Sequence, residues 1–220
     1  MRVCHIITRL IVGGAQENTI LTCEGLAGRG HQVTLLAGPE TGPEGSLWGR
    51  AERGEYAANV VPWLRRAVRP ARDWRCLRQL RALLRRLRPD VVHTHSSKAG
   101  ILGRVAAAQA GVPLIVHTIH GMSFNRTQPW YVRRLFRALE RSCGRSTRAF
   151  IAVAQAMACQ ARQEGIVGDA WVEIIYSGIE TELFDPAACD RRRIRGQLGF
   201  QEPHFVIGTI ARLFPNKGYE

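Results

Sequence analysis

Two short stretches of the sequence combine residue types that could bind phosphate or handle a proton. Gly13 and Gly14 stand just before a helical stretch, where free backbone N–H groups and the helix dipole can receive a phosphate. Lacking the spacing of a dinucleotide loop or P-loop, the pair also fits a plain tight turn. Its place after the first predicted strand favours phosphate binding. His120 is the best candidate for a functional imidazole, because Gly121 after it lets the loop approach a ligand closely.

Arg212 and Lys217 form a second candidate phosphate site near the end of the sequence. Both follow a predicted strand, and two cations placed there can neutralise a diphosphate as it leaves a substrate. The alternative is ordinary solvated surface charge. Lys98 and Lys217 are the only lysines of the chain, and both follow predicted strands, which favours a functional role.

His93 and His95 flank Thr94, a spacing that could hold a metal ion. No cluster of Asp, Glu or Cys supplies further ligands, and histidines at alternate strand positions more often pack or hydrogen-bond. The sequence also has neither the Gly-x-Ser-x-Gly elbow of hydrolases nor an Asp-x-Asp metal motif. We therefore expect no metal and no bound cofactor, with His93 in a structural role.

Alternating strands and helices must position these residues. The pattern predicts strands at residues 3–8, 32–37, 59–63, 90–94, 113–118, 149–153 and 172–176. It predicts helices at residues 15–29, 72–88, 98–110, 129–143 and 155–164. This alternation predicts an α/β fold with a doubly wound, Rossmann-like parallel sheet. Ligands of such sheets bind beyond the carboxyl ends of the strands, where the candidate loops follow.

The pattern changes after Tyr176. Residues 177–186 are rich in turn formers, residues 190–198 predict a helix, and residues 205–210 predict one more strand. A single strand without a sheet cannot bury itself. We therefore expect a first domain over residues 1–186, and over 187–220 a linker with the first strand of a second, truncated domain.

Positive charge dominates the composition, with a net charge of +13. Residues 65–88 hold ten arginines and one acidic residue, and residues 126–148 hold seven arginines and one. The amphipathic helix predicted at 72–88 fits either a solvated arginine face or docking on anionic lipid. Few aromatic residues interleave with the arginines as base-stacking platforms would, so we expect no nucleic-acid partner.

The remaining composition excludes several classes of protein. With 45% hydrophobic and 22% charged residues, the chain is neither disordered nor a coiled coil. Polar residues interrupt every apolar stretch long enough to span a membrane, and the N-terminus lacks the pattern of a secretory signal. Six scattered cysteines without a Cys-x-x-Cys pair predict reduced thiols. We expect a cytoplasmic protein.

Taken in order along the chain, these stretches resemble the retaining, nucleotide-sugar-dependent glycosyltransferases of family 4, which have the two-Rossmann-domain architecture called GT-B. The resemblance is carried by residues 6–8, 13–17, 90–95, 118–121, 177–180, 208–213 and 217–218. The Asn-Gly-Ile-Asp turn usual in that family stands here as Ser-Gly-Ile-Glu at 177–180. The glutamate pair of the family that contacts the donor would lie beyond residue 220.

The resemblance implies transfer of a sugar from a nucleoside-diphosphate-sugar donor, a co-substrate, to an acceptor hydroxyl with retained anomeric configuration. The setting would be cell-envelope polysaccharide or glycolipid synthesis, with a lipid-linked or small-molecule acceptor and peripheral association with the inner face of the membrane. The implied roles are a catalytic His120 near the transferred sugar, donor diphosphate binding by Gly13, Gly14, Arg212 and Lys217, and acceptor-side positions at His95, Lys98 and Gly121.

Three alternatives stay open. One is a nucleotide-sugar epimerase of the same architecture. Another is a basic module that binds membrane or nucleic acid without catalysis. The third is a fragment that binds sugar nucleotides but has no activity by itself.

Overall fold

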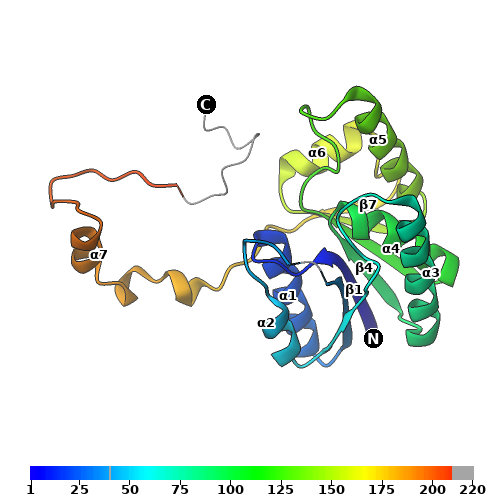
Figure 1. Cartoon of the computed structure of the whole chain (residues 1–220), viewed down its shortest axis with the longest axis horizontal. Helices are drawn as coiled ribbons and strands as arrows, with labels where there is room; N and C mark the ends of the chain where they lie inside the picture. Colours follow the sequence, from blue (N-terminus) through cyan, green and yellow to red (C-terminus); the bar gives the residue numbers. More distant parts are fainter. Residues whose placement is uncertain (40, 210–220) are drawn as a thin grey trace. The chain divides into compact units, whose positions relative to one another are not determined.

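A seven-stranded, wholly parallel sheet organises the first part of the chain (Figure 1). The computed structural model describes residues 1–39 and 41–209. The strands are β1 (Arg2–Arg9), β2 (Gln32–Gly38), β3 (Ala57–Val60), β4 (Val91–His95), β5 (Leu114–Ile119), β6 (Ala149–Ala152) and β7 (Trp171–Ile174). Their order is β3-β2-β1-β4-β5-β6-β7, which confirms the doubly wound Rossmann-like sheet predicted from the sequence.

Helices cover both faces of the sheet. They are α1 (Gly14–Ala27), α2 (Trp48–Arg53), α3 (Pro70–Leu87), α4 (Ser97–Ala110), α5 (Trp130–Gly144) and α6 (Gln155–Gln163). Ile20 and Cys23 of α1 pack with Ile7 and Leu35 in one core cluster. The other face carries a core of α3, α4 and sheet residues, and a further cluster lies around Phe150.

Two glycines let α4 lie directly on the sheet. A Cβ at Gly103 would come within 2.8 Å of the Thr94 side chain, and one at Gly100 within 2.7 Å of the His117 ring. Because no side chain separates α4 from β4 and β5 at these points, the N-terminus of α4 stays close to the carboxyl end of β4.

The winding of the sheet reverses between β1 and β4, which are neighbours although about 80 residues of chain separate them. From β1 the chain proceeds through α1 to β2, and from β4 it proceeds through α4 to β5 on the other side. The two helices therefore leave adjacent strand ends in opposite directions. Such a reversal opens a crevice at the carboxyl ends of the strands, where ligands of this architecture bind.

The predicted elements match the structure within a few residues, with informative exceptions. β3 ends at Val60 rather than at residue 63, because Pro62 has no N–H to donate to a neighbouring strand. The expected strand at 205–210 is wrong for its described residues, since 205–209 form no strand; residue 210 lies outside the described part. The sequence reading missed α2 and the 3-10 turns at Thr181–Phe184 and Pro186–Ala188.

The chain divides into two compact units, Met1–Gly178 and Ile179–Glu220. The domain boundary expected after residue 186 therefore lies inside the second unit, whose described part contains helix α7 (Arg191–Gln197). All six cysteines are unpaired. In the described part of the chain, every helix is too short or too polar to cross a membrane.

Candidate active site

The crevice between β1 and β4 is closed at its base by hydrogen bonds between Thr8 and Ser96. The ladder between β1 and β2 is irregular between Ile7 and Arg9, which turns the Thr8 peptide away from β2. The Thr8 N–H donates to Ser96 Oγ at 3.3 Å, and the two hydroxyls lie 2.7 Å apart. Thr8 Oγ1 also accepts the Ala99 N–H of α4 at 3.1 Å, so α4 is capped from the neighbouring strand.

Ser96 adopts a backbone conformation that non-glycine residues rarely use. Its φ is 60° and its ψ is 164°. This region is largely restricted to glycine, and such strain tends to occur at functional sites where the surrounding structure enforces it. Here the bonds to Thr8 and the start of α4 enforce it.

The N-terminus of α1, in contrast, has no side-chain cap. Gly13 precedes the helix, and its carbonyl accepts the N–H groups of Gln16 and Glu17. Gly14 is exposed, and a Cβ added there would meet nothing within 4 Å. The first N–H groups of α1 are therefore open to a ligand, as a phosphate site requires.

Three imidazoles run in a row from the sheet interior to this crevice. His5 Nδ1 lies 3.0 Å from His95 Nε2, and His95 Nδ1 lies 3.1 Å from His120 Nε2. His5 and His95 are fully buried, whereas His120 is half-buried at the rim. Burial lowers the pKa of His5 and of His120 to about 4 and that of His95 well below its usual value. All three rings are neutral at pH 7.

The remaining two strand histidines hydrogen-bond to threonines. His93 Nε2 lies 2.7 Å from Thr118 Oγ1, and His117 Nδ1 lies 2.9 Å from Thr94 Oγ1. One ring nitrogen from each of His5, His93 and His95 lies within 4.8 Å of the other two, so these described residues form a group that could hold a metal ion. A metal there would have to replace the contact between His5 and His95.

Lys98 of α4 forms an ion pair with Asp73 of α3. Its Nζ lies 2.5 Å from Asp73 Oδ2 and donates to the Ala67 carbonyl at 3.3 Å. Both side chains are mostly buried. The charge of Lys98 is thus balanced within the protein while its stem borders the crevice.

A cavity of about 430 Å³ opens from the crevice and joins the candidate loops. Its polar lining includes Gln16 of α1, Ser96 to Lys98 at the start of α4, and Ser123 beyond His120. Its apolar lining comes from α4 and α5, namely Ile101, Leu102, Leu135, Phe136 and Leu139, of which Leu135 and Leu139 are exposed. The cavity therefore combines polar residues at the strand ends with a partly exposed apolar surface of two helices.

The predicted site residues of the first unit gather at this rim. Gly13 and Gly14 stand at α1, Lys98 borders the cavity, and His120 with Gly121 follows β5. His95 reaches the rim only through its bond to His120. Arg212 and Lys217 lie outside the described residues. The sequence did not point to His5 or Asp73, because nothing in their local sequence signals a partner 90 or 25 residues away.

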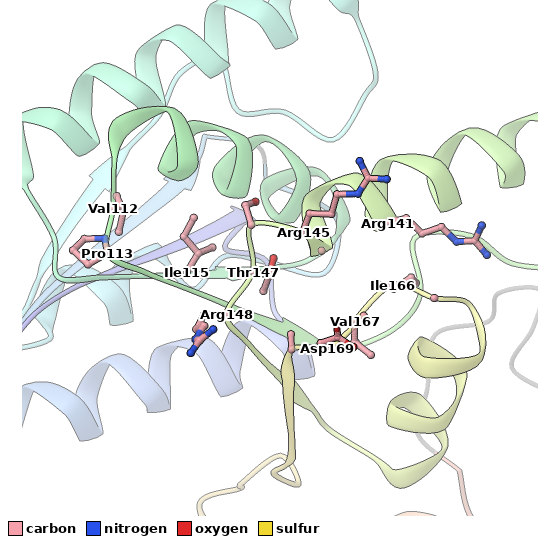
Figure 2. A pocket seen from close by; sticks show the side chains of 15 residues that line it. Val112, Pro113, Ile115, Arg141, Arg145, Thr147, Arg148, Ile166, Val167 and Asp169 are labelled. Atoms are coloured by element: carbon pink, nitrogen blue, oxygen red, sulfur yellow. The ribbon is translucent and has the colours of Figure 1, made fainter.

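A larger cavity, of about 650 Å³, lies at the opposite edge of the sheet (Figure 2). It is lined by residues that precede β5, β6 and β7, with the side chains of Arg141, Arg145 and Arg148 labelled in the view. Because it sits at the amino ends of the strands, it shares no residue with the crevice.

Comparisons with known proteins place this geometry in one family. The family model described as Glycosyltransferase Family 4 matches residues 12–183. The chain is 30% identical over 217 residues to the UDP-Gal:alpha-D-GlcNAc-diphosphoundecaprenol alpha-1,3-galactosyltransferase of Escherichia coli, covering 99% of this chain and 55% of that protein. The chain thus spans about half the length of this relative.

Solved structures share the fold at low identity. The crystal structure of Anabaena HepE in complex with UDP-glucose is similar with a TM-score of 0.66 at 20% identity, over 90% of this chain and 50% of that one. The UDP-GlcNAc 2-epimerase of Methanocaldococcus jannaschii is similar with a TM-score of 0.55 at 13% identity, over 81% and 45%. A protein solved with UDP-glucose and an epimerase therefore share this fold, so the chemistry must be argued from the site.

Proposed function

The chain belongs to Glycosyltransferase Family 4, and from that premise we propose that the whole protein moves a glycosyl group from a nucleoside diphosphate sugar to an acceptor hydroxyl. One observation carries the proposal. At the reversal of the sheet, an uncapped helix N-terminus, a neutral imidazole and an apolar cavity meet at the same rim. These are a phosphate site, a polar group for a sugar and a place for a large acceptor.

The donor diphosphate is assigned to the N-terminus of α1. Gly13 and Gly14 begin the helix without a side-chain cap, the space beside Gly14 is open, and the helix dipole favours an anion there. Arg212 and Lys217 are proposed to bind the same diphosphate from the second domain. In the transfer, the bond between the anomeric carbon and the diphosphate breaks with its electron pair going to the diphosphate. Cations and N–H groups around that leaving group stabilise its charge without a metal ion or cofactor.

His120 is proposed to hydrogen-bond the transferred sugar, with Gly121 allowing its close approach. The acceptor oxygen forms the new bond to the anomeric carbon, and its proton passes to an oxygen of the departing diphosphate. We propose retention of the anomeric configuration, in keeping with the family resemblance. Analysis of the anomer in the isolated product tests this point, because an inverted product contradicts it.

The acceptor is proposed to be a lipid-linked sugar bound in the apolar cavity. Leu135, Phe136 and Leu139 of α5 offer an apolar surface to a hydrocarbon chain, while Arg9 in the same lining suits a lipid phosphate. A diphosphoundecaprenol-linked acceptor appears in the name of the Escherichia coli relative. Lys98 then borders the head of the acceptor.

The decisive experiment uses the full-length protein with UDP-, GDP- and ADP-sugars, a chelator, and polyprenyl-diphosphate sugars as acceptors. We expect one donor to bind without metal and its sugar to appear on the lipid. His120→Ala is expected to reduce transfer about 100-fold while leaving nucleotide binding intact. Conversion of the sugar nucleotide to its epimer without acceptor would instead favour the epimerase. No binding by the folded protein contradicts both.

Peripheral membrane association is a separate part of the proposal. Arg75 and Arg78 are exposed on α3, and Arg81 beside them is half-buried. The guanidinium carbon of Arg78 lies 4.6 Å from the ring centroid of the exposed Trp74. Trp130 and Tyr131 are exposed at the start of α5. Basic and aromatic side chains together suit the headgroup region of an anionic bilayer. We place the protein at the cytoplasmic face, where unpaired cysteines persist.

Vesicles of phosphatidylglycerol test this surface. Replacing Arg75, Arg78 and Arg81 by glutamine is expected to weaken vesicle binding on the order of 100-fold, at roughly 1 kcal/mol per charge. Replacing Arg191, Arg192 and Arg193 of α7 removes the same charge elsewhere and is the control. Equal losses in both variants mean that only net charge matters and contradict a defined docking surface.

A further inference from the structure

The imidazoles of His5, His95 and His120 form a continuous chain of hydrogen bonds, although they come from three different strands or strand ends. The register of β1 and β4 pairs His5 with His93, and His95 follows two residues later on the same face. β5 pairs Thr118 with His95, so His120, two residues beyond Thr118, stands over His95 at the strand end. Sheet register therefore lines the three rings up from the interior to the rim.

Each ring nitrogen of His95 is occupied by another imidazole. Its Nε2 lies 3.0 Å from His5 Nδ1, and its Nδ1 lies 3.1 Å from His120 Nε2. A neutral imidazole has one N–H donor and one acceptor nitrogen. The tautomer of one ring therefore dictates the tautomer of the next, and only two arrangements of the whole chain satisfy both bonds.

The two arrangements differ at the buried end. His5 Nε2 is buried and has no hydrogen-bond partner among the described protein atoms. In the inward arrangement, His120 Nε2 donates to His95 and His95 Nε2 donates to His5 Nδ1. His5 must then carry its proton on Nε2, and a buried N–H is left without an acceptor. In the outward arrangement, His5 Nδ1 donates to His95 and His95 Nδ1 donates to His120, so His5 Nε2 carries only an unpaired lone pair. Buried donors without partners are the rarer defect in proteins, so the outward direction is favoured.

We propose that His5 and His95 are positioning residues that hold the proton of His120 on Nδ1, so that His120 presents a hydrogen-bond donor to an oxygen atom at the rim of the crevice. The importance of that donor for transfer rests on the proposed function, whereas the proton position itself does not. His120 Nδ1 has no bonding partner among the described residues, which leaves this nitrogen for a ligand. A donor fits a sugar hydroxyl or phosphate oxygen, and it is the wrong form to accept a proton from an acceptor hydroxyl.

Burial supports the neutral state that this chain requires. It lowers the pKa of every ring in the row, and the neighbouring His93, packed 4.3 Å from His95 between ring centroids, is lowered in the same way. A protonated His95 would donate from both of its nitrogens, so the tautomer of His5 would no longer determine that of His120.

The test is long-range proton–nitrogen NMR of ¹⁵N-histidine-labelled full-length protein at pH 7.5 without ligand. His120→Gln identifies the His120 signals. We expect protonated Nδ1 and unprotonated Nε2 at His120, with the same pattern at His95 and His5. A proton on His120 Nε2 overturns the proposal. Because no sugar nucleotide is added, this result is independent of whether the protein transfers sugars.

Substitutions on β4 separate proton placement from packing. His95→Leu removes the donor and is expected to release the His120 proton to Nε2, wholly or in part. His95→Asn keeps an amide near the former Nδ1 and is expected to preserve the wild-type pattern. His93→Gln alters an equally buried neighbour outside the chain and should leave His120 unchanged. An unchanged His120 in folded His95→Leu, or equal changes in His95→Leu and His93→Gln, contradicts the inference.

Transfer kinetics provide a second readout once a donor and acceptor are known. His95→Leu is expected to lower kcat about tenfold or more with little change in KM for the sugar nucleotide, and His95→Asn should restore most of it. If both variants transfer equally while the spectra differ, the proton position is right and its role in transfer is wrong.

Discussion

At two positions in the crevice, Gly14 and Gly121, neither packing nor backbone conformation requires a glycine. A Cβ at Gly14 or at Gly121 would meet nothing within 4 Å, and neither residue has the positive φ that favours glycine. The contrast is Gly38, where a Cβ would collide with the Leu64 carbonyl. At both Gly14 and Gly121, packing and backbone geometry leave room for a side chain, which is the space that a closely approaching ligand would need.

Alanine substitutions at these positions test whether a ligand occupies the space beside each glycine. Gly14→Ala is expected to leave the free energy of unfolding unchanged and to weaken sugar-nucleotide binding about tenfold, because the methyl group enters the space of the diphosphate. Gly121→Ala is expected to reduce transfer more than binding. Gly25→Ala in the middle of α1 is the control; it should stabilise by about 0.5–1 kcal/mol without affecting binding. Wild-type affinity in Gly14→Ala contradicts the donor assignment.

Ser96 gives a second prediction at the scale of one residue. Ser96→Ala and Ser96→Gly both lose the hydroxyl that bonds to Thr8, but only glycine relieves the strained backbone. We expect the glycine variant to be more stable by about 1 kcal/mol, reversing the usual preference for alanine. Urea denaturation of both variants provides the comparison. If alanine is the more stable, the strain at φ 60° is not real.

At the scale of elements, a buried ion pair joins α4 to α5. Arg104 is fully buried on α4, where its Nε donates to the Gly100 carbonyl at 2.8 Å and its guanidinium contacts Glu140 of α5. These are the two helices that line the apolar cavity. The pair thus holds the cavity walls together, and its geometry matters more than its net energy.

Removing one partner of the Arg104–Glu140 pair is expected to lower the free energy of unfolding more than replacing both partners does. Glu140→Gln leaves Arg104 buried opposite a neutral group and is expected to cost about 3–5 kcal/mol, whereas Arg104→Met with Glu140→Leu should lie near the wild type. The half-exposed pair of Arg50 and Glu24 between α2 and α1 is the control, and Glu24→Gln should cost no more than about 1 kcal/mol. Equal costs at the two pairs contradict the argument from burial.

At the scale of the whole molecule, neutral histidines make the first unit sensitive to acid. Burial lowers the pKa of five histidines in or next to the sheet, and the pKa of His5 and His120 falls to about 4. The unfolded chain binds protons near pH 6.5, so it gains protons first as the pH falls. The folded unit is therefore most stable above pH 6.5 and loses stability between pH 6.5 and 4.

The loss should be large enough to measure. Each histidine whose pKa falls from 6.5 to about 4 contributes up to about 3 kcal/mol by this linkage. All five tryptophans lie within Met1–Gly178, so fluorescence follows the unfolding of that unit alone. We expect the free energy of unfolding in urea to be nearly constant above pH 7 and clearly lower at pH 5. Equal values at pH 7.5 and pH 5 contradict burial of neutral histidines.

Local sequence patterns were enough to predict most strands and helices and the parallel sheet. Runs of apolar residues marked the strands, glycines and prolines marked the helix ends, and their alternation predicted the parallel sheet. The rule that ligands bind at the carboxyl ends of such strands then placed Gly14, His120 and Lys98 on one rim. These inferences succeed because strand, helix and turn preferences act between residues that are close in the sequence.

Only the tertiary structure decided which distant residues touch. Thr8 bonds to Ser96 and His5 to His95 across about 90 residues, through the register of β1 and β4, which no local pattern encodes. Lys98 meets Asp73 through the packing of α4 against α3, which local patterns also do not encode. The strand expected at 205–210 shows that local preference is not sufficient, because residues 205–209 form no strand. Side-chain chemistry can be read from the sequence, whereas partners are set by packing.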